Sequence, residues 1–215
     1  MPAPWTVIAS HDADEGVLEL HQQGDAFLIW FDGRVLMNSF SRSSEEALAT
    51  HALTSITTPA PRVMIGGLGM GYTLRAALDV LPADATVQVV ELNPVIVEWC
   101  MGPLAAATGN AVADPRVTIE LGDVAAAIAE APAGQLDAIL LDLYEGPNSA
   151  NQGVTDPFYS KAALARTHAA LAPGGVLGVW AEEADDEFAQ RMTTGFDVAQ
   201  AAIGSHHVVY LGTRR

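Results

Sequence analysis

From about residue 62 onward, short apolar runs alternate with segments whose apolar residues have helical spacing. Residues 63–65 form an apolar run, residues 72–81 place leucines and alanines three and four positions apart, and residues 86–90 form a second run. Short buried strands and amphipathic helices produce these two patterns. The segment from 62 to 93 is therefore predicted to be a strand, a helix and a second strand, which is the first half of a nucleotide-binding unit.

The same alternation continues to the C-terminus. Strands are predicted at residues 117–121, 136–141, 176–181, 196–203 and 207–211, and helices at 94–104, 122–131, 156–171 and 185–193. Strands that alternate with helices form a parallel sheet covered on both faces. The last two strands are joined directly at Gly204-Ser205 and are expected to be antiparallel. The main fold is thus predicted to be α/β, with a mostly parallel sheet and an antiparallel last strand.

The first 60 residues have a different pattern. Strands are predicted at residues 6–10, 17–21, 27–31 and 34–38, with a hairpin turn at Asp32-Gly33. A helix is expected over residues 44–56, started by a capping box of Ser43 and Glu46. We therefore predict two parts: a small antiparallel β unit with a helix in residues 1–60, and a nucleoside-binding domain in residues 61–215.

Three alternating glycines, Gly67, Gly69 and Gly71, follow the first strand of this domain. Glycine lets the backbone turn sharply and approach a ligand closely. Glu91 ends the next strand, about twenty residues on, where a carboxylate can accept hydrogen bonds from two ribose hydroxyls. Such a turn can also serve packing alone. No Lys-Ser/Thr pair follows the glycines, which disfavours a P-loop. The third-turn glycine is also missing, since Ala76 follows Arg75, and this favours an adenosyl compound without phosphates over a dinucleotide.

Acidic residues also follow the predicted carboxyl ends of other strands. They are Asp123, Asp142, Glu145 and Glu182. Ligands of parallel sheets bind at this edge. Simpler explanations exist, because Asp123 suits a helix N-cap and Glu145 suits a solvated loop. Together with Glu91 and the glycine turn, these residues predict one binding site at the carboxyl edge of the sheet.

The composition bounds the class of protein. The chain has 215 residues, a formal net charge of −16, 50% hydrophobic residues and a single cysteine, Cys100. An acidic surface repels nucleic acid and anionic membranes and attracts cationic ligands, although solubility alone would explain it. No apolar run approaches the ~20 residues that span a bilayer, and the N-terminus lacks a signal-peptide pattern. A cytoplasmic protein without disulfides is expected.

With these residues in place, the chain resembles the spermidine synthase family, within the seven-stranded S-adenosylmethionine-dependent methyltransferase fold. The similarity extends from about Phe31 to Ala181. The stretches GGLGMGYTLR, VVELNPVIVEWC, DPRV, GDV, LDAILLDLYEGPN and DPFYSKAALARTHAALAPGGVL resemble the family's motifs in the same order. The resemblance implies a Rossmann-like fold and transfer of an aminopropyl group from decarboxylated S-adenosylmethionine to an amine acceptor such as putrescine.

For the donor, the resemblance implies that the three glycines cradle the nucleoside and its sulfonium chain. It also implies that Glu91 holds the ribose hydroxyls and that Asp123 holds the adenine amino group. Decarboxylated S-adenosylmethionine or S-adenosylmethionine itself would be the co-substrate, with no metal.

For the acceptor, the resemblance implies that Asp142 takes the proton of the attacking amine. Glu145 would hold the second ammonium group of a diamine. The implied partners are a small cationic amine as substrate and a second copy of the chain in a homodimer. Neither nucleic acid nor a membrane is expected to bind.

Some positions depart from the family pattern. The family's turn has an aspartate where this chain has Met70, and its Tyr-His-Glu stretch falls on Glu45, Glu46 and Ala47. Ile65 stands where most methyltransferases have an acidic residue, which favours the spermidine synthase branch. The alternatives are an S-adenosylmethionine-dependent methyltransferase on the same scaffold, and a catalytically lapsed nucleoside-binding protein.

Overall fold

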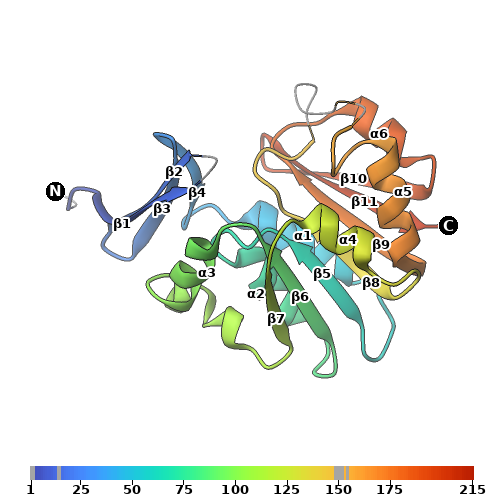
Figure 1. The fold of residues 1–215 in the computed structure, drawn as a ribbon, viewed down its shortest axis with the longest axis horizontal. Helices are drawn as coiled ribbons and strands as arrows, with labels where there is room; N and C mark the ends of the chain where they lie inside the picture. The colour runs from blue at the N-terminus through green and yellow to red at the C-terminus, as the bar shows by residue number, and fades with distance from the viewer. Residues whose placement is uncertain (1–2, 14–15, 148–152, 154) are drawn as a thin grey trace.

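The computed structural model describes residues 3–13, 16–147, 153 and 155–215 and contains two β-sheets (Figure 1). Asn148, the last residue of the LDAILLDLYEGPN stretch, lies outside the described residues. The smaller sheet is antiparallel, as predicted for the N-terminal unit. Its strands, in spatial order, are β1 (Thr6–Ala13), β2 (Gly16–Gln23), β3 (Ala26–Phe31) and β4 (Arg34–Asn38).

The larger sheet has seven strands in the order β10-β11-β9-β8-β5-β6-β7. They are β5 (Arg62–Gly66), β6 (Thr86–Glu91), β7 (Val117–Leu121), β8 (Leu136–Leu141), β9 (Leu171–Ala181), β10 (Phe196–Ile203) and β11 (His207–Arg214). The β5–β6, β6–β7, β5–β8 and β8–β9 pairs are parallel. β11 is antiparallel to both of its neighbours. The predicted sheet, with its antiparallel last strand, is therefore confirmed.

The strand order reverses at β5, which lies between β6 on one side and β8 on the other. Helices that follow strands on opposite sides of such a point cross to opposite faces, and they leave a crevice at the carboxyl ends of the strands. The carboxyl ends of β5, β6 and β8 are Gly66, Glu91 and Leu141. The glycine turn, Glu91 and Asp142 are thus brought to one edge of the sheet, although they are distant in sequence.

Within the described residues, six α-helices cover the two faces of the larger sheet (Figure 1). They are α1 (Ser43–Leu53), α2 (Tyr72–Val80), α3 (Pro94–Met101), α4 (Val124–Glu130), α5 (Lys161–Ala170) and α6 (Asp186–Met192), with short 3-10 turns at η1 (Ala105–Thr108) and η2 (Ala111–Ala113). One apolar core joins the sheet to α1, α2 and α3, and a second joins it to α4, α5 and α6. This is the three-layer arrangement that the alternating pattern predicted.

Helix α1 packs on the larger sheet, although it belongs to the stretch predicted as the N-terminal part. Leu48, Ala49 and Ala52 are fully buried. Gly178 of β9 makes the close approach possible, because a Cβ atom there would lie 3.0 Å from Leu48 Cδ1. Helix α1 therefore lies over β9 and brings its first turn, with Glu45, toward the carboxyl edge. A division of the chain at residue 60 stays a prediction.

Two local predictions are wrong. The helix expected from Asp156 begins at Lys161, because Asp156 instead forms a turn by accepting a hydrogen bond from the backbone N–H of Phe158, and Ser160 caps the helix. The expected capping box at the start of α1 does not form. Arg42 is the N-cap residue there, and the Glu46 carboxylate pairs with its guanidinium at 2.9 Å.

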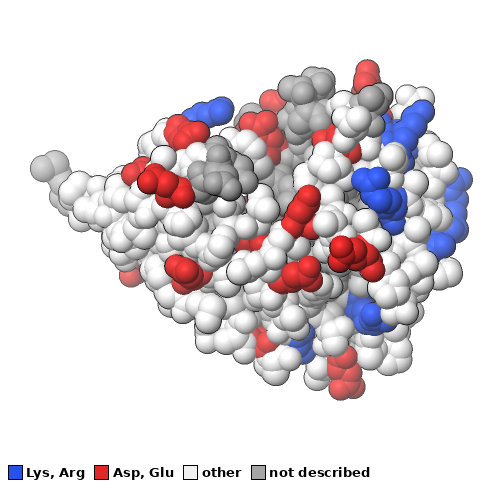
Figure 2. All heavy atoms as spheres, viewed as in Figure 1, with Lys and Arg blue, Asp and Glu red and all other residues white. Residues whose placement is uncertain are grey.

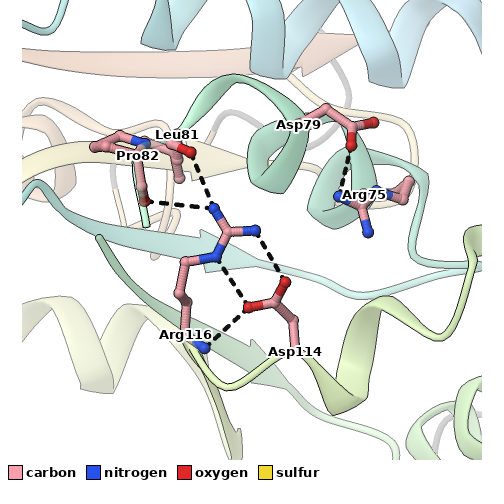
Figure 3. Close-up of polar contacts among 6 residues, drawn as sticks. All are labelled: Arg75, Asp79, Leu81, Pro82, Asp114 and Arg116. Atoms are coloured by element: carbon pink, nitrogen blue, oxygen red, sulfur yellow. Dashed lines mark hydrogen bonds and ion pairs between the residues drawn. The ribbon is translucent and has the colours of Figure 1, made fainter. Parts of the chain in front are cut away.

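The DPRV stretch holds the end of α2 against the turn before β7 (Figure 3). Arg116 Nε and Nη2 donate to the two carboxylate oxygens of Asp114, each at 2.9 Å, and Nη1 donates to the carbonyl of Leu81 at 2.9 Å. The Arg116 hydrogen bonds lower the pKa of Asp114 to about 2. Bidentate pairs of this kind are stronger than neutral hydrogen bonds.

We expect Asp114→Asn to lower the free energy of unfolding by about 1–3 kcal/mol at pH 7, because the guanidinium loses its charged partner. Because the pKa of Asp114 is lower in the folded than in the unfolded state, its ionised carboxylate stabilises the fold above the unfolded pKa of about 4. This stabilisation is lost as the pH falls toward 2. In urea titrations, the difference in the free energy of unfolding between Asp114→Asn and wild type should therefore become smaller below pH ~4. Asp79→Asn is the control, because the Asp79 side chain is 63% exposed and its ion pair among the described residues is with Arg75, one turn away on α2 (Figure 3). An equal effect of the two variants would contradict this account.

Candidate active site

The glycine turn runs from the end of β5 into α2. Gly67, Gly69 and Gly71 have φ angles of 87°, 52° and 84°, which residues with a Cβ atom rarely adopt. The Gly67 N–H donates to the carbonyl of Val90 at 2.9 Å and so ties the turn to β6. A Cβ atom on Gly67 would lie 2.2 Å from the backbone oxygen of Asp142. The turn and the end of β8 are therefore in direct backbone contact, and only glycine fits between them.

Glu91 lies beneath this turn and is 6% exposed. Its Oε2 accepts from the backbone N–H of Leu68 at 2.8 Å, and its Oε1 accepts from that of Asn93 at 2.9 Å. Burial raises the pKa of the carboxyl, and these backbone donors oppose the rise. Glu91 thus fixes the turn through both of its carboxylate oxygens. Its role toward a ribose stays a prediction.

Asp142 follows β8 and is partly buried. Its backbone N–H donates to the carbonyl of Gly66 at 2.9 Å, and Thr73 Oγ1 donates to its Oδ2 at 2.6 Å. Burial raises the pKa of Asp142 to about 7; the charges of Glu45 and Glu91 act in the same direction, and the Thr73 hydrogen bond opposes them. A carboxyl group with a pKa near neutrality suits proton transfer at physiological pH.

Asp123 has the helix-capping function that the sequence left open. Its Oδ1 accepts from the backbone N–H of Ala125 at 2.8 Å, and it is the N-cap residue of α4. The residue is exposed at the carboxyl edge of β7. A carboxylate that caps with one oxygen keeps the other for a ligand, so the implied contact with an adenine amino group stays a prediction.

Glu145 lies in the loop after β8 and is partly buried. Its backbone carbonyl accepts from the N–H of Glu182 at 3.2 Å, which holds the loop against the end of β9. Tyr144, before it, is half exposed, and its ring meets that of Phe31 edge-on at 6.2 Å. This contact joins the loop to strand β3 of the smaller sheet. An aromatic wall therefore lies beside the loop that carries Glu145.

Met70 turns away from solvent and contributes no charge to the turn. Its side chain is fully buried, and its backbone N–H donates to Met37 Sδ at 3.2 Å. Cys100 lies nearby, with its Sγ donating to the carbonyl of Gly69 at 3.2 Å. Burial raises the pKa of this thiol to about 12. The position where the family has an aspartate is thus part of an apolar, sulfur-rich contact between the turn, β4 and α3.

Two residues beside Asp142, Glu45 and Thr73, were not among the predicted site residues. Thr73 is in the first turn of α2, and Glu45 is in the first turn of α1 and only 7% exposed. The spacing of Glu45 to Leu48, Ala49 and Ala52 places it on the buried stripe of the helix. That spacing is the sequence signal that would have indicated its burial.

The described part of the chain contains no group of three or more His, Cys, Asp or Glu residues placed to hold a metal ion. None of its helices is long and apolar enough to cross a membrane.

The fold and the residues at its carboxyl edge define a class of protein: a Rossmann-like, seven-stranded methyltransferase-type domain preceded by a small antiparallel sheet. The crystal structure of spermidine synthase from Thermotoga maritima has the same fold, with a TM-score of 0.76 and 18% identity over 97% of this chain and 73% of that one. Spermidine synthase in complex with the transition-state analogue AdoDATO has a TM-score of 0.77 and 18% identity, over 97% of this chain and 74% of that one.

Comparison of sequences points to the same group of proteins. The chain is 38% identical over 132 residues to putrescine N-methyltransferase 1 of Nicotiana tabacum, a match that covers 60% of this chain and 32% of that protein. It is 30% identical over 153 residues to spermidine synthase 1 of Pisum sativum, which covers 70% of this chain and 43% of that protein. No family model matches the chain. The chain spans less than half the length of these relatives. The similarity to spermidine synthases that the motifs predicted is therefore confirmed.

Proposed function

We propose that this protein is a spermidine synthase-like transferase. It moves an aminopropyl group from decarboxylated S-adenosylmethionine to the nitrogen of a small amine such as putrescine. One observation carries the proposal: Asp142, with its pKa raised to about 7, contacts the glycine turn through its own backbone. A proton acceptor is thus fixed beside the place where the turn would hold the donor.

Different residues of the site bind the donor and the acceptor. In this proposal Gly67, Gly69 and Gly71 cradle the nucleoside, Glu91 holds the ribose and Asp123 the adenine amino group. Asp142 removes the proton of the attacking amine as the new N–C bond forms and the C–S bond of the sulfonium breaks, which leaves a neutral thioether. Glu145 holds the second ammonium of a diamine, and the acidic side chains on the face shown in Figure 2 attract cationic acceptors.

Methyl transfer from intact S-adenosylmethionine is the second candidate. Two observations favour it: the 38% identity to a putrescine N-methyltransferase, and the buried, uncharged Met70 at the position of the family's aspartate. Both candidates use the same fold and the same proton acceptor. They differ in the end of the donor that the protein must recognise. We also propose, as expected from the resemblance, a homodimer in the cytoplasm.

Calorimetric titration with S-adenosylmethionine and with its decarboxylated form tests the donor. We expect the decarboxylated form to bind more tightly, by about tenfold or more, because the residues assigned to the site include four acids and no Lys or Arg, so a methionine carboxylate would add a further like charge. Tighter binding of the intact donor would favour the methyltransferase. Binding of neither would contradict both candidates and the assigned role of Glu91.

A further inference from the structure

Glu45 is a buried carboxylate that the proposed chemistry has not used. It is 7% exposed, and its Oε2 accepts from Ser44 Oγ at 2.5 Å. Thr73 links it to Asp142: the Thr73 hydroxyl lies 3.4 Å from the Glu45 carbonyl oxygen and 2.6 Å from Asp142 Oδ2. Among the described residues, no Lys or Arg forms an ion pair with either carboxylate. Buried charges are normally paired, so two adjacent acids without a cation need a reason.

Trp180, whose ring packs against His207 with centroids 5.2 Å apart, adds an aromatic side chain to the surroundings of Asp142. Val179 is the register partner of Leu141, so Trp180 stands beside Asp142 on the neighbouring strand, on the same face of the sheet. Its indole Nε1 is buried and has no hydrogen-bond partner among the described residues. A carboxylate beside an indole, with a second acid close enough for its charge to act on the first, has the chemistry of an ammonium site, since aromatic rings attract cations as carboxylates do.

We propose that Glu45 and Asp142 together bind the reacting ammonium group of the acceptor, with Trp180 as a wall of this subsite. The inference rests on the proposed transfer to an amine and adds a residue to its acceptor site. Glu45 holds the cation by charge, and Asp142 accepts its proton. The pair therefore selects acceptors that arrive as cations over neutral or anionic nucleophiles. Glu45 stands at the position of the tyrosine in the family's Tyr-His-Glu stretch, so a carboxylate at this place in the subsite is particular to the chain.

The neighbouring glutamate supplies a matched control. Glu46 is on the same helix turn, but its side chain is 47% exposed and pairs with Arg42 at 2.9 Å. Glu45→Gln and Glu46→Gln remove the same charge one residue apart. Glu45→Asp keeps the charge and serves as the conservative variant.

The first experiment measures acceptor binding directly, by calorimetric titration of putrescine into protein saturated with 5′-methylthioadenosine. We expect Glu45→Gln to weaken putrescine binding by about tenfold or more, because a buried charge partner is lost. Glu46→Gln should bind as wild type, Glu45→Asp should bind better than Glu45→Gln, and nucleoside binding should be unchanged in all three. Unchanged putrescine binding by Glu45→Gln would overturn the inference.

The second experiment separates a direct effect from a structural one. The charges of Glu45 on α1 and Glu91 at the end of β6 raise the pKa of Asp142, and the Asp142 charge in turn raises the pKa of the buried Tyr159 hydroxyl before α5. Removal of the Glu45 charge should move the acidic limb of the kcat/KM profile to lower pH by about one unit. Glu46→Gln should leave it in place. If Glu45 only supported the fold, Glu45→Gln would lower the melting temperature without moving the acidic limb of the kcat/KM profile. That result would contradict the inference.

These outcomes also distinguish the inference from the proposed function. Wild-type protein that binds putrescine, loses that binding in Glu45→Gln and shows no turnover would reject the transferase while supporting the amine subsite. Turnover that is equal in wild type and Glu45→Gln at every pH and putrescine concentration would support the transferase and reject the subsite. Wild-type protein that binds neither putrescine nor propylamine would reject both.

Discussion

Replacement of Asp142 by asparagine should lower kcat by about 10²–10⁴-fold and leave nucleoside binding close to that of wild type. Asparagine has nearly the same shape and can still accept the hydrogen bond that Thr73 donates to Oδ2 at 2.6 Å. It cannot take a proton from an amine. The measurement is steady-state turnover with saturating donor and acceptor, together with calorimetric titration of 5′-methylthioadenosine. Turnover like that of wild type would show that Asp142 is not the proton acceptor.

The pH dependence of the wild type gives an independent readout for the same residue. Because the pKa of Asp142 is raised to about 7, kcat/KM should rise with pH and reach a plateau above this value. A carboxyl with a raised native pKa binds more protons in the folded than in the unfolded state. Its ionisation therefore costs stability as the pH increases from about 4 to 7. Asp142→Asn should remove this cost, and at pH 8 it should melt at a higher temperature than wild type.

A rise in stability joined to a loss of activity would separate the two roles of the residue. Asp137→Asn is a suitable control, because Asp137 is also on β8 but at its amino end, where it accepts from Thr58 and from the Arg62 backbone. That variant should lose stability and keep its turnover. An Asp142→Asn protein that melts earlier than wild type would show that lost activity reflects lost structure.

The donor side of the site could be predicted from the sequence because its determinants are local. Gly67, Gly69 and Gly71 lie within five residues, and all three adopt the left-handed conformations that their residue type suggests. Glu91 was placed by a regular spacing along one strand–helix–strand unit. The alternation of strands and helices fixed the parallel sheet in the same way, since each unit folds back on its predecessor.

The acceptor side depends on contacts between distant segments, which a single sequence does not display. The first turn of α1, with Glu45, lies near Asp142 because Gly178 of β9 lets α1 approach the sheet closely, and Thr73 lies between the two residues. No pattern near Glu45 indicates this proximity. The predicted start of α5 was wrong for a related reason. Asp156 and Ser160 are both good N-cap residues, and in the folded loop it is Ser160 that caps the helix. The capping box at Ser43 gave way to the pair between Arg42 and Glu46.

Contacts between the elements also explain how the residues that would bind the donor and those that would bind the acceptor are held at fixed positions relative to one another. The Gly67 turn touches the backbone of Asp142, Thr73 of the following helix donates to its side chain, and Glu91 binds the turn from below. Each element is tied to its neighbour by a backbone contact or a buried hydrogen bond. A rigid arrangement of this kind is what in-line transfer requires, because small displacements of the reacting groups lower rates strongly.

The position most sensitive to substitution should therefore be Gly67. Gly67→Ala is expected to lower the free energy of unfolding by about 2–5 kcal/mol, from the strain of a left-handed alanine and from overpacking. The new Cβ atom would lie 2.2 Å from the Asp142 carbonyl oxygen, which is backbone and cannot rotate away. The clash would push the end of β8 from the turn, so nucleoside binding and turnover should fall together.

Gly174→Ala measures the backbone strain of a left-handed alanine without the overpacking. Gly174 has a φ angle of 76°, close to the 87° of Gly67, and a Cβ atom there would meet nothing within 4 Å. Its alanine variant should lose only about 1–2 kcal/mol, the strain of the backbone alone. Urea unfolding of both variants measures the difference. If Gly67→Ala were no less stable than Gly174→Ala, the turn would have room to yield. The proposed rigid coupling between the nucleoside cradle and Asp142 would then be wrong.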